Sequence, residues 1–110
     1  MLMIEIACQA LRQRKVLELQ YNGFSRSVEV HVCGYTELGH AVLRAWQISG
    51  GGPRGEQQGW KLMRLDEASD AQISEQTSEA PRRGFKPGDP AIARIVCEVG
   101  PRLAANDPHR

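Results

Sequence analysis

A glycine-rich segment, ISGGGPRGEQQGW, has a spacing that binds phosphate in many nucleotide-dependent enzymes. Its Gly50, Gly52 and Gly55 fit the pattern G-x-G-x-x-G. The dinucleotide form of this pattern requires a strand before it and a helix directly behind it. A strand is expected before the segment, but Gly59 and Trp60 stand where the helix would begin. The sequence therefore predicts a mobile, ligand-free connection between two strands and no phosphate site.

Histidine and cysteine side chains are a second source of possible chemistry. The candidate zinc ligands are His31, Cys33, His40 and Cys97. Structural zinc sites usually contain closely spaced ligand pairs, and here only His31 and Cys33 are close. No nucleophile, base and orienting group are recognisable around any thiol or histidine. The sequence therefore predicts no metal site, no cofactor and no enzyme activity.

The cysteine count indicates a reducing compartment. Cys8, Cys33 and Cys97 are far apart and odd in number, which is typical of free thiols. Cys97 alternates with Ile95 and Val99, so we expect these three on one face and Cys97 in the core. The N-terminus has no signal-peptide pattern, and no apolar run approaches the ~18 residues of a membrane span. These features predict a cytoplasmic protein with reduced cysteines and no membrane association.

Basic and aromatic residues offer a third possibility. Arg44 and Trp46 share a face of one expected strand, and Trp60 and Arg64 share a face of the next. If the two strands pair, arginines and indoles line one surface, which suits an anionic ligand with a flat ring. The alternative places both tryptophans in the core and the arginines along its edge. We favour the core for the tryptophans and leave both possibilities open for the arginines.

The length and charge of the chain limit its partners. Its 110 residues suit one domain, and 14 basic residues nearly balance 13 acidic ones. No strong electrostatic attraction to nucleic acid follows from this balance. Residues 65–80 hold five acids and no base, whereas residues 81–94 hold four bases and one acid. Such runs are usually solvated surface.

The apolar periodicity predicts one helix followed by short strands. Residues 1–15 carry an amphipathic stripe, which consists of Met3, Ile6, Ala7, Ala10 and Leu11. The expected strands are 16–21, 27–35, 41–48, 59–65 and 92–99, with a short edge strand around 71–74. In the strand 27–35, strict alternation predicts Val28, Val30 and Val32 on one face and Glu29, His31 and Cys33 on the other.

These elements predict a mainly β fold with one N-terminal helix. Tight connections between neighbouring strands favour a small antiparallel sheet of about five strands, curled into a partly open barrel with the helix over one end. We expect one domain over residues 1–100, an ordered loop over 81–90, a mobile loop over 49–58 and a loose tail over 101–110.

Four segments together resemble the WYL domain family. They read ALRQRKVLELQY, RSVEV, GHAVLRAW and GWKLMRLDEA, and they cover about residues 4–68. The resemblance rests on dispersed short motifs. It implies an Sm-like, SH3-type small β-barrel that acts as a sensing module in bacterial transcription regulation. The sequence departs from the family where the Trp-Tyr-Leu triplet would lie, because Ala41, Val42 and Leu43 stand there.

The resemblance also implies a ligand site. It assigns the strand-ending tyrosine to Tyr21, the groove arginine to Arg26, and two further basic positions to Lys61 and Arg64. With Arg44 from the basic and aromatic pattern, these residues predict a groove for an anionic ligand, either a nucleotide or nucleic acid. The alternative is a protein-interaction or accessory module. A concave cluster of these basic groups would favour the first, and exposed apolar residues on an open strand edge would favour the second.

Overall fold

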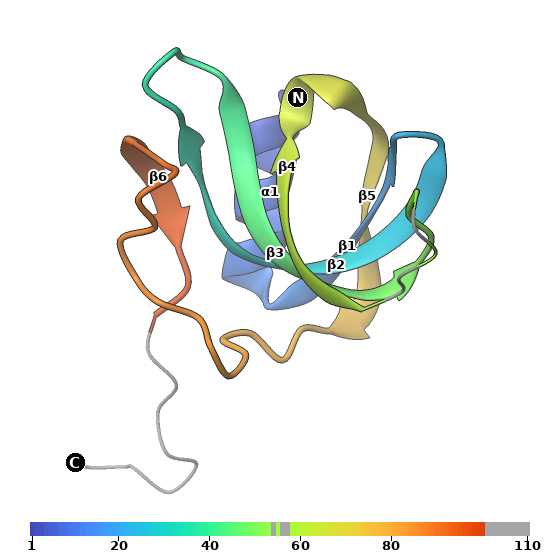
Figure 1. Ribbon diagram of the computed structural model, residues 1–110. Helices are drawn as coiled ribbons and strands as arrows, with labels where there is room; N and C mark the ends of the chain where they lie inside the picture. Colours follow the sequence, from blue (N-terminus) through green and yellow to red (C-terminus); the bar gives the residue numbers. More distant parts are fainter. Residues whose placement is uncertain (54, 56–57, 101–110) are drawn as a thin grey trace, which may run out of the picture.

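The computed structural model describes residues 1–53, 55 and 58–100 (Figure 1). The elements in these residues are α1 (Met3–Gln13), β1 (Lys15–Tyr21), β2 (Phe24–Tyr35), β3 (Ala41–Gly50), β4 (Gly59–Arg64), the 3-10 helix η1 (Leu65–Glu67), β5 (Ala68–Thr77) and β6 (Arg94–Glu98). The tail predicted over 101–110 lies outside them, as do residues 54, 56 and 57 of the predicted mobile loop. No helix in the described part of the chain has the length and apolar character needed to cross a membrane.

The strands form one antiparallel sheet that curls into an open barrel (Figure 1). Its order is β4-β3-β2-β1-β5, and β6 pairs with the second half of β2. The helix packs on β2, β5 and β1. We call the sheet face that packs against α1 the inner face and the opposite one the outer face. The predicted mainly β, partly open barrel with one helix is confirmed, although the described residues form six strands.

The main core lies between α1 and the inner face. The helix contributes Ile4, Ala7 and Cys8, and β1 and β3 contribute Leu17 and Leu43. The fully enclosed members of this core are all apolar residues or cysteines. The amphipathic helix is therefore confirmed, and burial of its apolar face against the sheet is the main source of its stability.

A bulge in β2 changes which side chains face this core. Val30 and Val32 are two residues apart, but their partners on β3 are adjacent, so His31 is an extra residue. Beyond His31 the alternation is reversed: Cys33 lies in the main core, and Val32 lies in a second apolar cluster on the outer face. The prediction of strict alternation along this strand is therefore wrong past the bulge.

Glu29 and His31 of β2 are buried, because the chain after β5 covers the outer face. Glu29 is 1% exposed and His31 is 0% exposed. Arg82 donates to both carboxylate oxygens of Glu29, at 2.6 and 3.2 Å, and its backbone N–H donates to Nε2 of His31 at 2.9 Å. The backbone N–H of Glu79 also donates to Glu29. The ordered loop predicted over 81–90 is thus confirmed, and polar contacts hold it in place.

The acidic segment forms a longer strand than expected. Only residues around 71–74 are predicted as a strand, but β5 pairs with β1 along most of its length. Ala71 and Ile73 pack on the main core, while most of its other side chains are exposed. The backbone ladder to β1, which leaves little trace in side-chain composition, accounts for the additional residues.

A second bulge occurs where β6 pairs with β2. Cys33 lies opposite Cys97, but the next residue of β2, Gly34, lies opposite Ile95, so Val96 is extra. Cys97 is buried, whereas Ile95 and Val96 are 39% and 43% exposed. Burial of Cys97 is therefore confirmed, and the expectation that Ile95 shares its face is wrong.

Candidate functional site

Three of the five predicted ligand residues lie on the inner face, toward the end of the sheet formed by the β1–β2 turn. The register pairs Tyr21 with Phe24 and Leu19 with Arg26, and side chains alternate along each strand. Lys61 pairs with Ala45, a member of the main core, so it also belongs to the inner face. Tyr21, Arg26 and Lys61 therefore share one face of the sheet, as the ligand hypothesis requires.

Arg26 is a buried cation and not the exposed groove residue that was expected. Its residue exposure is 4%. Its Nη1 donates to Oε1 of Gln47 at 3.3 Å, whereas Nε and Nη2 have no hydrogen-bond partner in the part of the chain that the structure describes. The guanidinium carbon lies 5.1 Å from the ring centroid of Tyr21 and 5.7 Å from that of Phe24. Two aromatic rings thus partly compensate the charge by cation–π attraction.

The hydroxyl of Tyr21 joins β1 to the corner between β4 and η1. It accepts a hydrogen bond from the backbone N–H of Arg64 at 3.3 Å and donates to Oε1 of Glu67 at 3.3 Å. These two bonds fix the ring that lies beside Arg26. Tyr21 is therefore a positioning residue in this arrangement, and its hydroxyl is engaged by the protein.

The glycine segment packs against the same place. A Cβ atom on Gly51 would lie 2.5 Å from the Phe24 ring, and one on Gly50 would lie 2.3 Å from the carbonyl oxygen of Ser25. The Gly51 carbonyl accepts a hydrogen bond from Gln47, which also contacts Arg26. Because β4 follows the segment, the predicted hairpin connection is confirmed. Its first glycines nevertheless have a packing role that the prediction did not include.

Two of the predicted residues, Arg44 and Arg64, lie on the outer face instead. Nε of Arg44 donates to Asp89 at 2.7 Å, and this hydrogen bond is the largest influence that lowers the pKa of Asp89. Arg64 is paired with Asp66 at the surface, which raises the pKa of the arginine. The predicted groove with Arg26, Lys61 and Arg64 as its walls is therefore wrong, because alternation along β4 sends Lys61 and Arg64 to opposite faces.

The two tryptophans lie on the same outer face as Arg44 and Arg64, so the predicted surface of arginines and indoles on the paired strands is confirmed. Trp46 and Trp60 are opposite each other on β3 and β4, with ring centroids 5.4 Å apart and nearly perpendicular planes. His31 packs against Trp60 at 4.7 Å and against Phe85 at 5.1 Å. Burial lowers the pKa of His31, and its Nδ1 lies 2.9 Å from the Glu29 carbonyl oxygen. Both tryptophans are half-buried, in a second aromatic layer and not in the main core.

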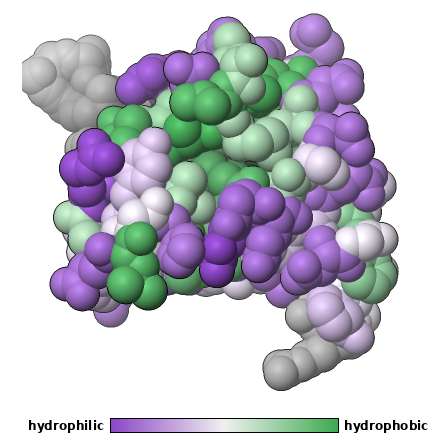
Figure 2. All heavy atoms as spheres, turned by 90° about the horizontal axis from the view of Figure 1, so that it is seen from above, coloured by the Kyte–Doolittle hydropathy of each residue, from purple (hydrophilic) through white to green (hydrophobic). Residues whose placement is uncertain are grey.

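The outer face also carries an apolar groove of about 1020 Å³. Trp46, Pro81, Phe85, Pro87 and Val99 supply its apolar lining. At the end of the molecule where the N-terminus and the β2–β3 turn lie, further apolar side chains gather among polar ones (Figure 2). Charged residues also line the groove, namely Glu79, Arg82, Arg83 and Glu98, so its surface is mixed.

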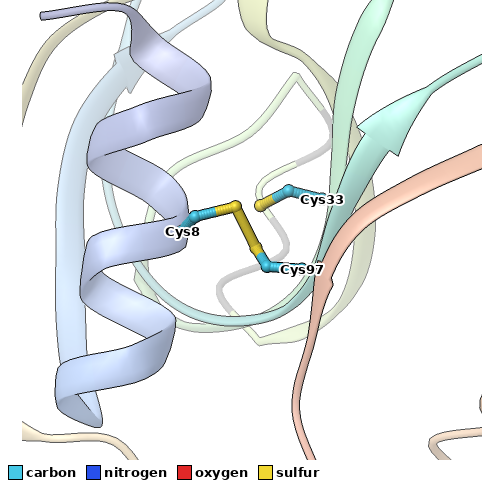
Figure 3. A group of neighbouring side chains, drawn as sticks. All are labelled: Cys8, Cys33 and Cys97. Atoms are coloured by element: carbon cyan, nitrogen blue, oxygen red, sulfur yellow. A yellow bond between two sulfur atoms is a disulfide. The ribbon is translucent and has the colours of Figure 1, made fainter.

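The cysteines differ from the sequence prediction. Cys8 on α1 and Cys97 on β6 form a disulfide, so the expectation of three free thiols is wrong (Figure 3). Cys33 is the remaining free cysteine, and burial raises the pKa of its thiol to about 12. The bulge places His31 and Cys33 on opposite faces of the sheet, so the closest pair of the candidate zinc ligands does not converge.

Sequence reasoning missed several residues that organise these sites. Phe24 lies two positions before Arg26, which is enough to predict that the two share a strand face. Glu29 and Asp89 were not recognised, because their arginine partners lie 53 and 45 residues away in the chain. Only the three-dimensional fold brings such pairs together.

A scan of protein-family models and searches of curated proteins and of solved structures each returned no match. The WYL resemblance therefore stays a prediction.

Proposed function

We propose that this chain is a non-enzymatic small-barrel module that binds an anionic group at Arg26. The supporting observation is a buried guanidinium whose Nε and Nη2 have no partner in the described residues. A buried cation without a counterion is costly, and native proteins rarely leave buried donors unsatisfied. Nε and Nη2 form one edge of the guanidinium, so a carboxylate or phosphate can accept from both at once. An anion bound there would offset both costs.

The ligand would be recognised mainly by charge. The rings of Tyr21 and Phe24 contact the guanidinium itself, so they are already engaged by the protein. A nucleotide or oligonucleotide would then be held through a phosphate, and its base would contribute less. The Phe24 ring lies beside the guanidinium and Gly51 packs against that ring, so we expect the Phe24 side chain to move aside when an anion binds. Phosphate contacts of this kind weaken as salt increases.

The proposal includes the WYL resemblance and a regulatory role in the cytoplasm. Tyr21 and Arg26, the first two positions that the resemblance assigns to its groove, are in contact. Lys61 lies on the same face, but Arg64 does not. A cytoplasmic location also requires that the protein folds when Cys8 and Cys97 are reduced, and the stability of the reduced protein tests this requirement.

Thermal denaturation tests the anion site. We expect pyrophosphate, adenosine nucleotides or short oligonucleotides to raise the melting temperature, and more so at low salt, because a ligand of the folded state stabilises it. Arg26→Met should abolish this increase. It should not lower the melting temperature of the free protein, since replacing an unpaired buried charge by an apolar side chain is often neutral or stabilising. Arg83→Ala, which removes an exposed arginine, is the control and should respond like the wild type.

Two results would contradict the proposal. One is an Arg26→Met variant that still responds to the anions. The other is a wild-type protein that none of these anions stabilises at either salt concentration. If Arg26→Met unfolds the protein, Arg26→Lys retains the charge without the guanidinium edge, and it should weaken the response.

A second candidate function is protein interaction, which is favoured by the division of the predicted basic residues between the two faces and by exposed apolar residues on an edge strand. The edge strand β6 exposes Ile95 and Val96, and the apolar groove ends at Val99 and Gly100 beside it. An extended peptide could add to such an edge. Affinity capture from cells of the source organism, with the wild type and with Val96→Glu, tests this function. A partner retained only by the wild type supports it, and identical sets of captured proteins contradict it.

A further inference from the structure

Three cysteine sulfurs meet at one point in the main core. Cys8 comes from α1, Cys33 from β2 and Cys97 from β6, and their Sγ atoms lie within 4.8 Å of one another (Figure 3). Cys33 and Cys97 are opposite each other in the β2–β6 ladder, and the helix brings Cys8 over them. The sequence spaces these residues 25 and 64 positions apart, so only the fold forms the cluster.

Once the disulfide is reduced, the distances between the three sulfur atoms suit binding of all three to one sulfur-binding metal or metalloid ion. Three sulfurs around one metal ion lie about 4 Å apart, because a metal–thiolate bond is about 2.3 Å long. The 4.8 Å limit on the present separations is close to that value. Three rigid elements already hold the sulfurs, so little rearrangement is needed beyond separation of the Cys8–Cys97 pair.

The residues around the three sulfur atoms restrict which ion can bind there. All three cysteines are buried, and the other fully enclosed members of this core are alanine, isoleucine, leucine, methionine and valine. Among the described histidine, cysteine, aspartate and glutamate side chains, these three cysteines lie close enough to share one ion, and no fourth such donor joins them. Structural zinc sites almost always have four ligands, and catalytic zinc sites complete a set of three with water, which this apolar core does not favour.

Charge restricts the choice further. Three thiolates leave a net charge of −1 with a divalent ion such as Zn²⁺ and of −2 with Cu⁺. The charge that acts on Cys33 is that of Arg12, an exposed side chain, so a net charge in this core is still costly. A trivalent ion gives a neutral complex. We propose that the reduced cysteine triad is a binding site for trivalent arsenic, which completes its coordination with three sulfurs.

The reaction balances without an oxidant. A thiol reductant first converts the disulfide to two thiols and is itself oxidised to a disulfide, so Cys8, Cys33 and Cys97 all carry S–H groups. Arsenous acid, As(OH)₃, then forms three As–S bonds as its three As–O bonds break. Each hydroxide leaves with a thiol proton as water, so three water molecules are released and no electrons are transferred. The oxidised protein has one thiol left and cannot form this complex.

Intact-protein mass spectrometry tests the site with arsenite as the probe. The full chain is reduced with a phosphine, separated from it without oxygen and mixed with one equivalent of arsenite. The reduced wild type should gain one arsenic and lose three hydrogens, and its three thiols should become resistant to alkylation. The oxidised protein should gain no arsenic.

Cys33→Ala is the matched variant, because it removes one ligand and leaves the disulfide pair unchanged. Its oxidised form should retain the disulfide and a native circular dichroism spectrum, which establishes that it folds. Its reduced form should bind arsenite at least about 100-fold more weakly than the wild type, since even the loss of an outer contact to a metal ligand costs about 10–100-fold. Any adduct with two thiols would keep one hydroxyl, which the mass reveals.

Three outcomes would overturn the proposal. The first is the absence of an adduct on the reduced wild type. The second is a wild-type adduct that keeps a hydroxyl, which would mean that only two thiols react. The third is stoichiometric displacement of arsenic by one equivalent of Zn²⁺, which would assign the triad to a divalent ion.

Discussion

The buried carboxylate of Glu29 receives two hydrogen bonds from the guanidinium of Arg82, 53 residues later in the chain. The pair fastens the segment after β5 to the outer face of β2, and Glu29 is almost completely enclosed. Removing Arg82 would leave a carboxylate buried with only a backbone N–H donor among the contacts described for it. Because an uncompensated buried charge is costly, this contact should dominate the stability of the outer layer.

We therefore expect Arg82→Ala to lower the free energy of unfolding by about 3 kcal/mol, the lower end of the range for a broken buried pair, because the Arg82 side chain is 31% exposed. The neighbouring Arg83→Ala, at an exposed position, should change it by less than about 0.5 kcal/mol. Urea denaturation at neutral pH measures both. Equal, small effects of the two substitutions would show that the Glu29 contact contributes little.

His31 should make the stability depend on pH. Burial lowers its pKa below the ordinary value of 6.5, so the folded state holds the neutral ring while the unfolded state gains a proton as the pH falls. The unfolded state then binds more protons than the folded state, so the free energy of unfolding decreases as the pH falls below about 6.5. The decrease is at most about 1.4 kcal/mol per pH unit, and it ends at the pKa of His31 in the folded state. His31→Gln should remove this part of the pH dependence, whatever its effect at neutral pH. His40→Gln, at the end of the β2–β3 turn, should retain it, and urea denaturation between pH 5 and 8 compares the three proteins.

The elements of this fold follow largely from sequence periodicity, but the side-chain environment of β2 does not. Alternation predicts the strand correctly, yet the extra residue His31 sends Val32 and Cys33 to faces opposite to those expected. The position of a bulge depends on how two strands pair, so it cannot be predicted from the composition of either strand alone. The burial of Glu29 has a similar origin, because the segment that covers it lies about 50 residues later in the chain.

In the candidate site, too, contacts within one hairpin could be predicted from the sequence, whereas contacts between distant segments could not. Tyr21 and Arg26 were placed by short motifs and do lie together, because both belong to one hairpin with regular alternation. Arg44 is predicted from its spacing to Trp46 and Arg64 from the family resemblance, and regular alternation places both with the tryptophans on the outer face, away from Arg26. Phe24 lies beside Arg26, and the contact of Phe24 with Gly51 is a tertiary one that sequence spacing does not reveal.

The disulfide should contribute strongly to stability, because it joins residues that are 89 positions apart. Constraining so long a loop in the unfolded chain is expected to add about 2–5 kcal/mol. Reduction of the wild type should lower the urea midpoint accordingly. In Cys97→Ala the midpoint should be the same with and without reductant. A reductant effect that persists in this variant would have to come from something other than the Cys8–Cys97 bond.

Gly34 should be intolerant of any side chain, because β6 approaches its backbone closely. A Cβ atom there would lie 2.1 Å from the carbonyl oxygen of Arg94 and 2.5 Å from Cγ2 of Ile92. The first of these atoms is backbone, so β6 would have to move away from β2, and overpacking of this kind costs about 1–3 kcal/mol. We expect Gly34→Ala to lower the free energy of unfolding by about that amount and to speed amide hydrogen exchange in β6. Gly100→Ala, where a Cβ atom meets nothing within 4 Å, is the matched control. If Gly34→Ala unfolds and exchanges like the control, β6 does not depend on this close approach.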